Sequence, residues 1–228
     1  RRAIENFTLA VERDSGYALA YSGLADALTL GWFYGFEVGD EPLERGLERD
    51  PLSPAVHSSA ALAYVALDDV AAAERHWRRA VDLEPGYGLG WLSVGRILAA
   101  SGSPEDGIPA AERGRRTLTE RGDSIWGGLA SLATVQALAG RPDSARVLLE
   151  RARRSGTAPF WIGLAYAAMG ERDPAFAWLG RSRWERTVPI RFRYHPVLDP
   201  LRSDPRFDDL LARLERAWGL TAPASPPA

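Results

Sequence analysis

The sequence predicts an all-α fold: a right-handed superhelical array of about five and a half helix-turn-helix hairpins, closed by a C-terminal capping helix. Two ladders of small residues predict this class. The first ladder, with spacings of 36, 34, 34, 38 and 30 residues, consists of Ala3, Gly39, Ala73, Gly107, Ala145 and Ala175. The second, with spacings of 36, 34, 38 and 30 residues, consists of Ala25, Ala61, Gly95, Ala133 and Gly163. A period of about 34 residues is typical of helical repeats, in which small side chains let two antiparallel helices approach closely.

The N-terminal elements come first in this array. Ala3, Phe7 and Ala10 are expected to lie on the second helix of a hairpin, and the next hairpin starts near Tyr21. Its second helix, near residues 39–46, is rich in glycine and is therefore a poor helix. The clearest hairpin spans residues 54–87, where Pro85 ends the second helix because proline lacks an amide hydrogen and clashes with the preceding turn.

The next three hairpins follow the same rules. The hairpin that opens with Trp91 turns at Ser101-Gly102, and two further hairpins are centred on the turns at Gly140 and Gly170. Cap residues stand before first-turn prolines at Ser103-Pro104, Asp173-Pro174 and Asp204-Pro205. The helix after Ser103 is expected to be the weakest, because it contains Gly107, Pro109 and Gly114. Replacing a mid-helix glycine by alanine typically gains ~1 kcal/mol.

The chain is expected to end in a capping helix near residues 204–217. Its apolar residues at helical spacing are Phe207, Leu210, Leu211 and Leu214. A terminal cap hides the apolar side of the last hairpin, so the repeat array is assigned to residues 1–221. Residues 222–228 are rich in Pro and Ala and are expected to be a disordered tail.

Composition argues against an enzyme. All 28 basic residues are arginines, and the chain has no cysteine, so P-loop, Schiff-base and thiolate chemistry are excluded within it. The three histidines, His57, His76 and His195, have no metal-ligand spacing and are interpreted as structural. We therefore expect no catalytic residues, no cofactor and no metal.

The pattern of the best hairpins resembles tetratricopeptide repeats. One second helix reads Ala, aromatic, Ala and Pro, and the next first helix reads Trp, small residue and bulky apolar residue; these are Ala73, Trp77, Ala80, Pro85, Trp91, Gly95 and Leu98. The segments Gly170–Leu179 and His195–Phe207, with Tyr21–Ala27 and Gly31–Phe36, resemble a narrower group: the repeat regions attached to bacterial Ser/Thr kinases, adenylate cyclases and winged-helix transcription regulators. The resemblance covers the chain up to about Leu220 and does not indicate which effector domain is attached.

This resemblance implies a protein–protein interaction or scaffolding module of a larger bacterial signalling or transcription regulator. The first residue is not Met and lies in a helical pattern, so the chain is expected to be a piece of a longer polypeptide. No secretory signal or bilayer-spanning run is present in it. The expected location is cytoplasmic, with the extracytoplasmic side of a membrane-anchored regulator as the alternative.

The expected binding site is the groove lined by the outward positions of each first helix. These positions are Leu19, Ser22, Asp26, Ser58, Leu62, Leu92, Arg96, Ala130 and Thr134. The lining is small and apolar, with Asp26 and Arg96 as its charges, so it suits an apolar peptide segment or the protein's own effector domain. A carboxylate clamp for chaperone C-termini is not expected, because such a clamp needs more basic side chains and asparagine.

Two alternatives remain. Arginines and aromatics interleave in residues 181–194, as in some proteins that bind single-stranded nucleic acid, although arginine stems covering apolar surface explain the run better. Residues 1–110 carry 9 arginines and 17 acidic residues, a net charge of −8, whereas residues 111–228 carry 19 and 13, a net charge of +6. The opposite net charges of the two halves favour head-to-tail self-association as a second possibility.

Overall fold

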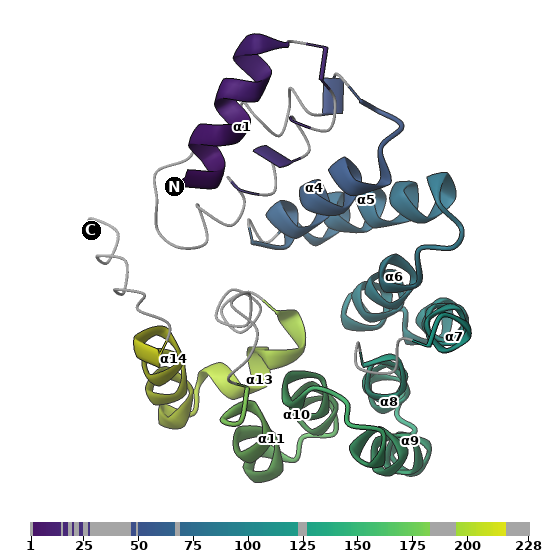
Figure 1. Ribbon diagram of the computed structural model, residues 1–228. Coiled ribbons are helices and arrows are strands. Elements are labelled where there is room, and N and C mark those ends of the chain that lie inside the picture. Colours follow the sequence, from purple (N-terminus) through teal and green to yellow (C-terminus); the bar gives the residue numbers. More distant parts are fainter. Residues whose placement is uncertain are drawn as a thin grey trace. The chain divides into compact units, whose positions relative to one another are not determined.

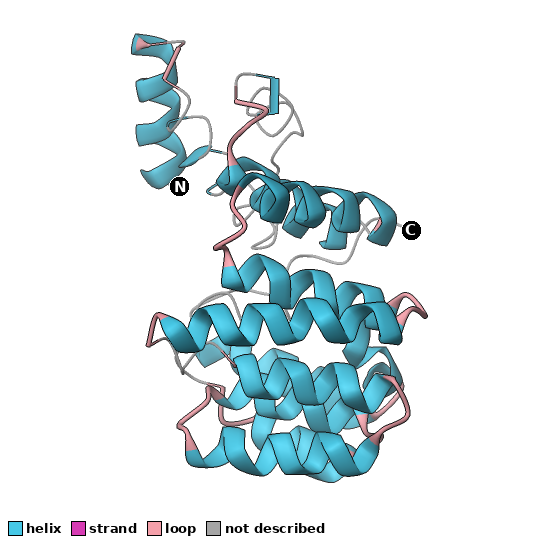
Figure 2. Cartoon of the chain, turned by 90° about the vertical axis from the view of Figure 1, so that its right-hand side faces the viewer, coloured by secondary structure: helices cyan, strands magenta, loops and turns pink. Residues whose placement is uncertain are grey.

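A computed structural model of residues 1–228 gives the architecture (Figure 1). The residues that it describes are 2–14, 16–17, 20, 23–24, 27, 47–48, 50–66, 69–122, 127–182 and 195–217. In these ranges the chain forms α-helices and one 3-10 helix, and no β-strand (Figure 2). The chain divides into two compact units, Arg1–Glu84 and Pro85–Thr221, which are described separately.

The first unit contains α1 (Arg2–Arg13), α4 (Pro54–Ala66) and α5 (Val70–Leu83). Helices α4 and α5 pack together as a hairpin. The carboxylate of Asp69 caps α5 by accepting a 2.8 Å hydrogen bond from the amide of Ala72, which satisfies a donor that has no partner inside the helix. The ladder residues Ala61 and Ala73 are fully buried in this unit, as expected for close helix packing.

The second unit contains three consecutive hairpins. They are α6 (Gly88–Ala100) with α7 (Pro104–Glu120), α8 (Gly128–Leu138) with α9 (Pro142–Arg154), and α10 (Pro159–Ala168) with α11 (Arg172–Leu179). The first helices stack, with α8 in contact with both α6 and α10 (Figure 1). This arrangement confirms the predicted all-α array of helix-turn-helix hairpins.

Each of these hairpins turns at a glycine with positive φ. Gly102, Gly140 and Gly170 have φ of 90°, 70° and 76°, a region that side chains with a Cβ rarely adopt. The next amide in each turn reaches back to a carbonyl in the last turn of the first helix, at Leu98, Gln136 and Tyr166, over 2.8 to 3.0 Å. This is the hydrogen bond of a Schellman motif. The same local chemistry therefore ends the first helix of all three hairpins.

Glycines also set the distance between α6 and α7. A Cβ on Gly107 would lie 2.5 Å from the carbonyl oxygen of Gly95, and a Cβ on Gly95 would lie 2.8 Å from the carbonyl oxygen of Gly107. Two turns further along the contact, a Cβ on Gly114 would lie 2.7 Å from both the carbonyl oxygen of Gly88 and the amide nitrogen of Leu92. The residues that weaken α7 as an isolated helix are therefore the ones that let its backbone touch α6.

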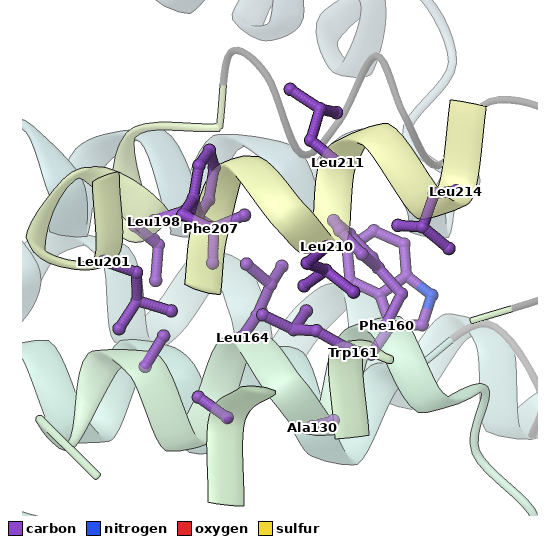
Figure 3. Packing of buried hydrophobic residues seen from close by; sticks show 14 of the residues in the cluster. Ala130, Phe160, Trp161, Leu164, Leu198, Leu201, Phe207, Leu210, Leu211 and Leu214 are labelled. Atoms are coloured by element: carbon purple, nitrogen blue, oxygen red, sulfur yellow. The ribbon is translucent and has the colours of Figure 1, made fainter. Parts of the chain in front are cut away.

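The C-terminal segment covers the last hairpin. It consists of the 3-10 helix η1 (Pro196–Leu198), α13 (Asp199–Arg202) and α14 (Pro205–Ala217). The apolar face of α14 packs over Phe160, Trp161 and Leu164 of α10 (Figure 3). The buried residues of α14 in this cluster are Phe207, Leu210, Leu211 and Leu214. Burial of this face, rather than helix propensity, is what fixes α14 in place.

Ion pairs of Arg206 join the start of α14 to the start of α11. The guanidinium of Arg206 forms a 2.6 Å ion pair with Asp173 on α11 and a 2.7 Å ion pair with Asp204, the residue just before α14. It also lies 4.4 Å from the centre of the Phe176 ring. The side-chain hydrogen bond from Arg206 lowers the pKa of Asp204 to about 2.

Titration of Asp204 tests this arrangement. We expect its carboxyl group to titrate near pH 2 in the folded protein, and Arg206→Ala to return its pKa toward about 4. Because the folded pKa lies below the unfolded one, the stabilisation is complete above about pH 4 and is lost as the pH falls toward 2. Carboxyl carbon NMR shifts measure both values. An Asp204 that titrates normally in the wild-type protein would show that the ion pair does not form.

Candidate functional site

The sequence places its candidate binding residues on the first helices of successive hairpins. Leu19, Ser22 and Asp26 lie outside the described residues. Ser58 and Leu62 lie on α4 in the first unit. Ser58 is buried and donates a 2.8 Å hydrogen bond to the carbonyl oxygen of Pro54, whereas Leu62 is 40% exposed. Of this pair, Leu62 is therefore the side chain with exposed apolar surface.

The four candidates of the second unit are all buried. Leu92 and Ala130 have no exposed surface, and the hydroxyl of Thr134 donates a 2.9 Å hydrogen bond to the carbonyl oxygen of Ala130. The physical reason is the stacking of α8 against both α6 and α10, which covers facing positions that helical spacing alone would leave open. In this structure Leu92, Ala130 and Thr134 belong to the interior, contrary to their expected place on an open groove.

Arg96 is the charged residue at the centre of this face. Its guanidinium donates a 2.8 Å hydrogen bond to Ser131 on α8 and a 3.1 Å hydrogen bond to Ser93 on its own helix α6. The same group lies 4.6 Å from the centre of the Trp161 ring on α10, within the range of a cation–π interaction. We call Ser93, Arg96, Ser131 and Trp161 the arginine cluster. It joins the first helices of three successive hairpins.

The arginine cluster is energetically unusual. Arg96 is only 9% exposed, and removing a guanidinium from water costs free energy that hydrogen bonds and ring stacking offset in part. An apolar residue at the same place would pack without that cost. Such a side chain gives the face positive charge and hydrogen-bond donors in a region of low dielectric constant, where both interact strongly with an anionic or carbonyl-bearing group.

Sequence reasoning identified Arg96 and missed its three partners. A usable signal was present, because Ser131 lies 35 residues after Arg96, close to one repeat period. Ser131 also lies one helical turn before the candidate Thr134, so it shares a face with it. Trp161 stands in the same relation to Leu164 on α10. Moving from Arg96 to the equivalent position of the next repeat, and then back by one helical turn, leads to Ser131. The same two steps from Thr134 lead to Trp161.

The alternative nucleic-acid segment is only partly described. Residues 183–194 lie outside the described residues, whereas Arg181 lies 4.6 Å from the centre of the Trp178 ring. The guanidinium of Arg153 on α9 approaches the same ring at 5.6 Å. Both arginines therefore pack on a tryptophan of their own chain.

The described ranges contain no group of three or more His, Cys, Asp or Glu side chains arranged to hold a metal ion. None of their helices combines the length and the hydropathy that crossing a lipid bilayer requires.

Solved structures show what the fold is similar to. MamA has 17% sequence identity, with 67% of this chain and 80% of MamA covered and a TM-score of 0.52. YrrB, a TPR protein with an unusual peptide-binding site, has 18% identity, with 94% of this chain and 100% of YrrB covered and a TM-score of 0.54. The chain therefore has the fold of tetratricopeptide repeat proteins. No protein-family profile and no curated protein matches it.

Proposed function

We propose that this chain is a protein–protein interaction module that acts as a scaffold, not as an enzyme. It binds an extended or helical peptide segment, from another protein or from its own effector domain, on the face formed by its first helices. The observation that carries this proposal is the arginine cluster. A buried guanidinium that contacts residues of three hairpins stabilises a core less than an apolar side chain would. We therefore infer that Arg96 has a role in binding.

The exposed leucine of α4 is a separate candidate contact, in the first unit. Leu62 stands on the first helix of its own hairpin and offers apolar contact area. Apolar contact of this kind is common in the recognition of peptides by helical grooves. YrrB, which has the same fold, is a protein with a peptide-binding site, and this supports the proposal by analogy of fold.

The wider context is also proposed. The segments 170–179 and 195–207 resemble those of repeat regions in bacterial regulators, and the Arg206–Asp173 ion pair joins them. On this basis the module belongs to a larger cytoplasmic bacterial regulator with a kinase, cyclase or winged-helix effector domain. The reading frame upstream of Arg1 tests this: one of those domains is expected there, and an unrelated domain would refute the proposal.

A peptide-binding experiment tests the proposed face. Peptides are selected on the wild-type chain from a random library, and their affinity is then measured for Arg96→Glu with Leu62→Glu. We expect at least a tenfold loss of affinity, about 1.4 kcal/mol, because the double change reverses the charge at one contact and makes the other polar.

Two further variants keep the result interpretable. Leu62→Glu alone changes an exposed residue, so it tests the face even if the buried Arg96 variant loses helicity by circular dichroism. Val147→Glu is the matched control, because Val147 is 64% exposed on α9, a second helix. Peptides whose affinity is unchanged by Leu62→Glu and by the double variant would contradict the proposed site.

A further inference from the structure

Two histidines meet across the α4–α5 hairpin. The Nδ1 atoms of His57 on α4 and His76 on α5 lie 2.9 Å apart. The Nε2 atom of His57 lies 3.0 Å from the carbonyl oxygen of Pro51. We call His57 and His76 the histidine pair. Its geometry sets the position of each proton, because a carbonyl oxygen only accepts hydrogen bonds.

The hydrogen bonds assign the tautomers. His57 must carry its proton on Nε2 in order to donate to Pro51, so the Nδ1 atom of neutral His57 is an acceptor. The Nδ1 atom of His76 must then donate to it, since two bare nitrogens at 2.9 Å would repel each other. Neutral His76 is therefore protonated on Nδ1, and its Nε2 atom is free to take up a proton.

The ring positions distinguish this hydrogen bond from a metal site. The ring centres lie 5.2 Å apart, which exceeds the Nδ1–Nδ1 distance by about the radii of the two rings. The two nitrogens therefore lie close to the line between the ring centres and face each other, as an N–H···N hydrogen bond requires. Lone pairs that bound one metal ion would instead converge on a point to the side of that line.

The surroundings of His76 disfavour a charge on its ring. Burial is the largest cause that lowers the pKa of His76, followed by the charges of His57 and Arg75. His57 faces it from α4, Arg75 is its neighbour on α5, and the ring of Tyr64 on α4 stacks on it at 5.2 Å. The described residues around His76 thus contribute positive charges and an aromatic ring.

We propose that the histidine pair is a proton-sensitive contact, which holds α4 against α5 with no proton or one proton bound and fails when both rings are protonated. One added proton on Nε2 of His76 leaves the Nδ1 hydrogen bond intact. A second proton has to go to Nδ1 of His57. It would place two N–H groups and two positive charges face to face, so the hydrogen bond is lost.

The sign of the pH dependence follows. Once α4 and α5 separate, the burial and the neighbouring charges that lower the pKa of His76 are removed and it returns toward about 6.5, so the open state binds more protons than the closed one in mild acid. The contact therefore contributes its full stability above about pH 6.5 and loses it as the pH falls below that value. For each extra proton bound by the open state, the opening constant rises up to about tenfold per pH unit.

NMR of the wild-type protein tests the contact directly. Imidazole nitrogen shifts should show His57 protonated on Nε2 and His76 on Nδ1 at about pH 7.5, and His76 should take up its proton below its ordinary pKa. The opposite tautomers, or an ordinary midpoint for His76, would overturn the proposal. Added zinc should leave the spectra unchanged, and zinc-dependent shifts of both rings would overturn it as well.

Hydrogen exchange shows whether the amides of α4 and α5 open when the pH falls. Between about pH 7.5 and about pH 5, the opening constant of the α4 and α5 amides, corrected for intrinsic exchange, should rise about tenfold more in the wild type than in His76→Gln. His195→Gln is the matched control, because it removes the third histidine, outside this hairpin, and should keep the wild-type slope. Equal slopes for the wild type and His76→Gln would refute the proposal.

Discussion

Replacing Gly107 by alanine is expected to lower the free energy of unfolding by about 3 kcal/mol, although the same change in an exposed helix gains ~1 kcal/mol. The expected loss comes from backbone contact. The added Cβ would lie 2.5 Å from the carbonyl oxygen of Gly95 and 3.3 Å from the amide nitrogen of Ala99. Neither atom can move away without displacing α6, because both belong to its backbone.

Replacing Gly95, which faces Gly107 across the contact, should also lower the free energy of unfolding. A Cβ on Gly95 would lie 2.8 Å from the carbonyl oxygen of Gly107 and 2.9 Å from the Cβ of Ala111, so Gly95→Ala should also be destabilising. The double variant should cost less than the two single changes together, because one displacement of α7 from α6 relieves both clashes.

Denaturant unfolding followed by circular dichroism measures these changes. Arg116→Ala is the control, because Arg116 is an exposed residue of the same helix α7, and its replacement should change stability by no more than about 0.5 kcal/mol. A Gly107→Ala protein as stable as the wild type would mean that α6 and α7 lie further apart than the structure places them.

These glycines show which features of a helix contact the sequence predicts and which it does not. The ladder of small residues placed Gly95 and Gly107 correctly at a helix contact, because a fixed spacing reports which positions face each other. It could not tell whether the contact needs glycine or merely tolerates it. That depends on the distance between two backbones, and Gly107 had instead been interpreted as a weakness of its helix.

The candidate site shows the same limit. Helical spacing identified Arg96 as a first-helix residue, but it treated each first helix as though one side faced solvent. Burial of Leu92 and Thr134 depends on how closely α8 stacks against its neighbours, which no single helix encodes. The contact between His57 and His76 was also missed, because it depends on two side-chain conformations across a hairpin and both rings had been interpreted only as structural.

The second large effect is expected at Phe160. Its ring is 1% exposed, meets the ring of Trp161 edge to face at 5.1 Å, and belongs to the same apolar cluster as Leu210 and Leu214 of α14 (Figure 3). Phe160→Ala should lower the free energy of unfolding by about 3 to 5 kcal/mol, because it removes apolar burial and leaves a cavity between α10 and α14. Denaturant unfolding measures the loss.

A double-mutant cycle shows whether this loss comes from the contact with α14. Leu210→Ala alone should cost about 2 to 5 kcal/mol, and the double variant with Phe160→Ala should cost less than the sum by at least about 0.5 kcal/mol. Leu149→Ala is the matched control, because Leu149 is equally buried but belongs to a different apolar cluster, with Ile162 and Ala165. It should be additive with Leu210→Ala. Additivity for Phe160 and Leu210 would mean that α14 does not rest on α10, and that the apolar face of the last hairpin is covered in some other way.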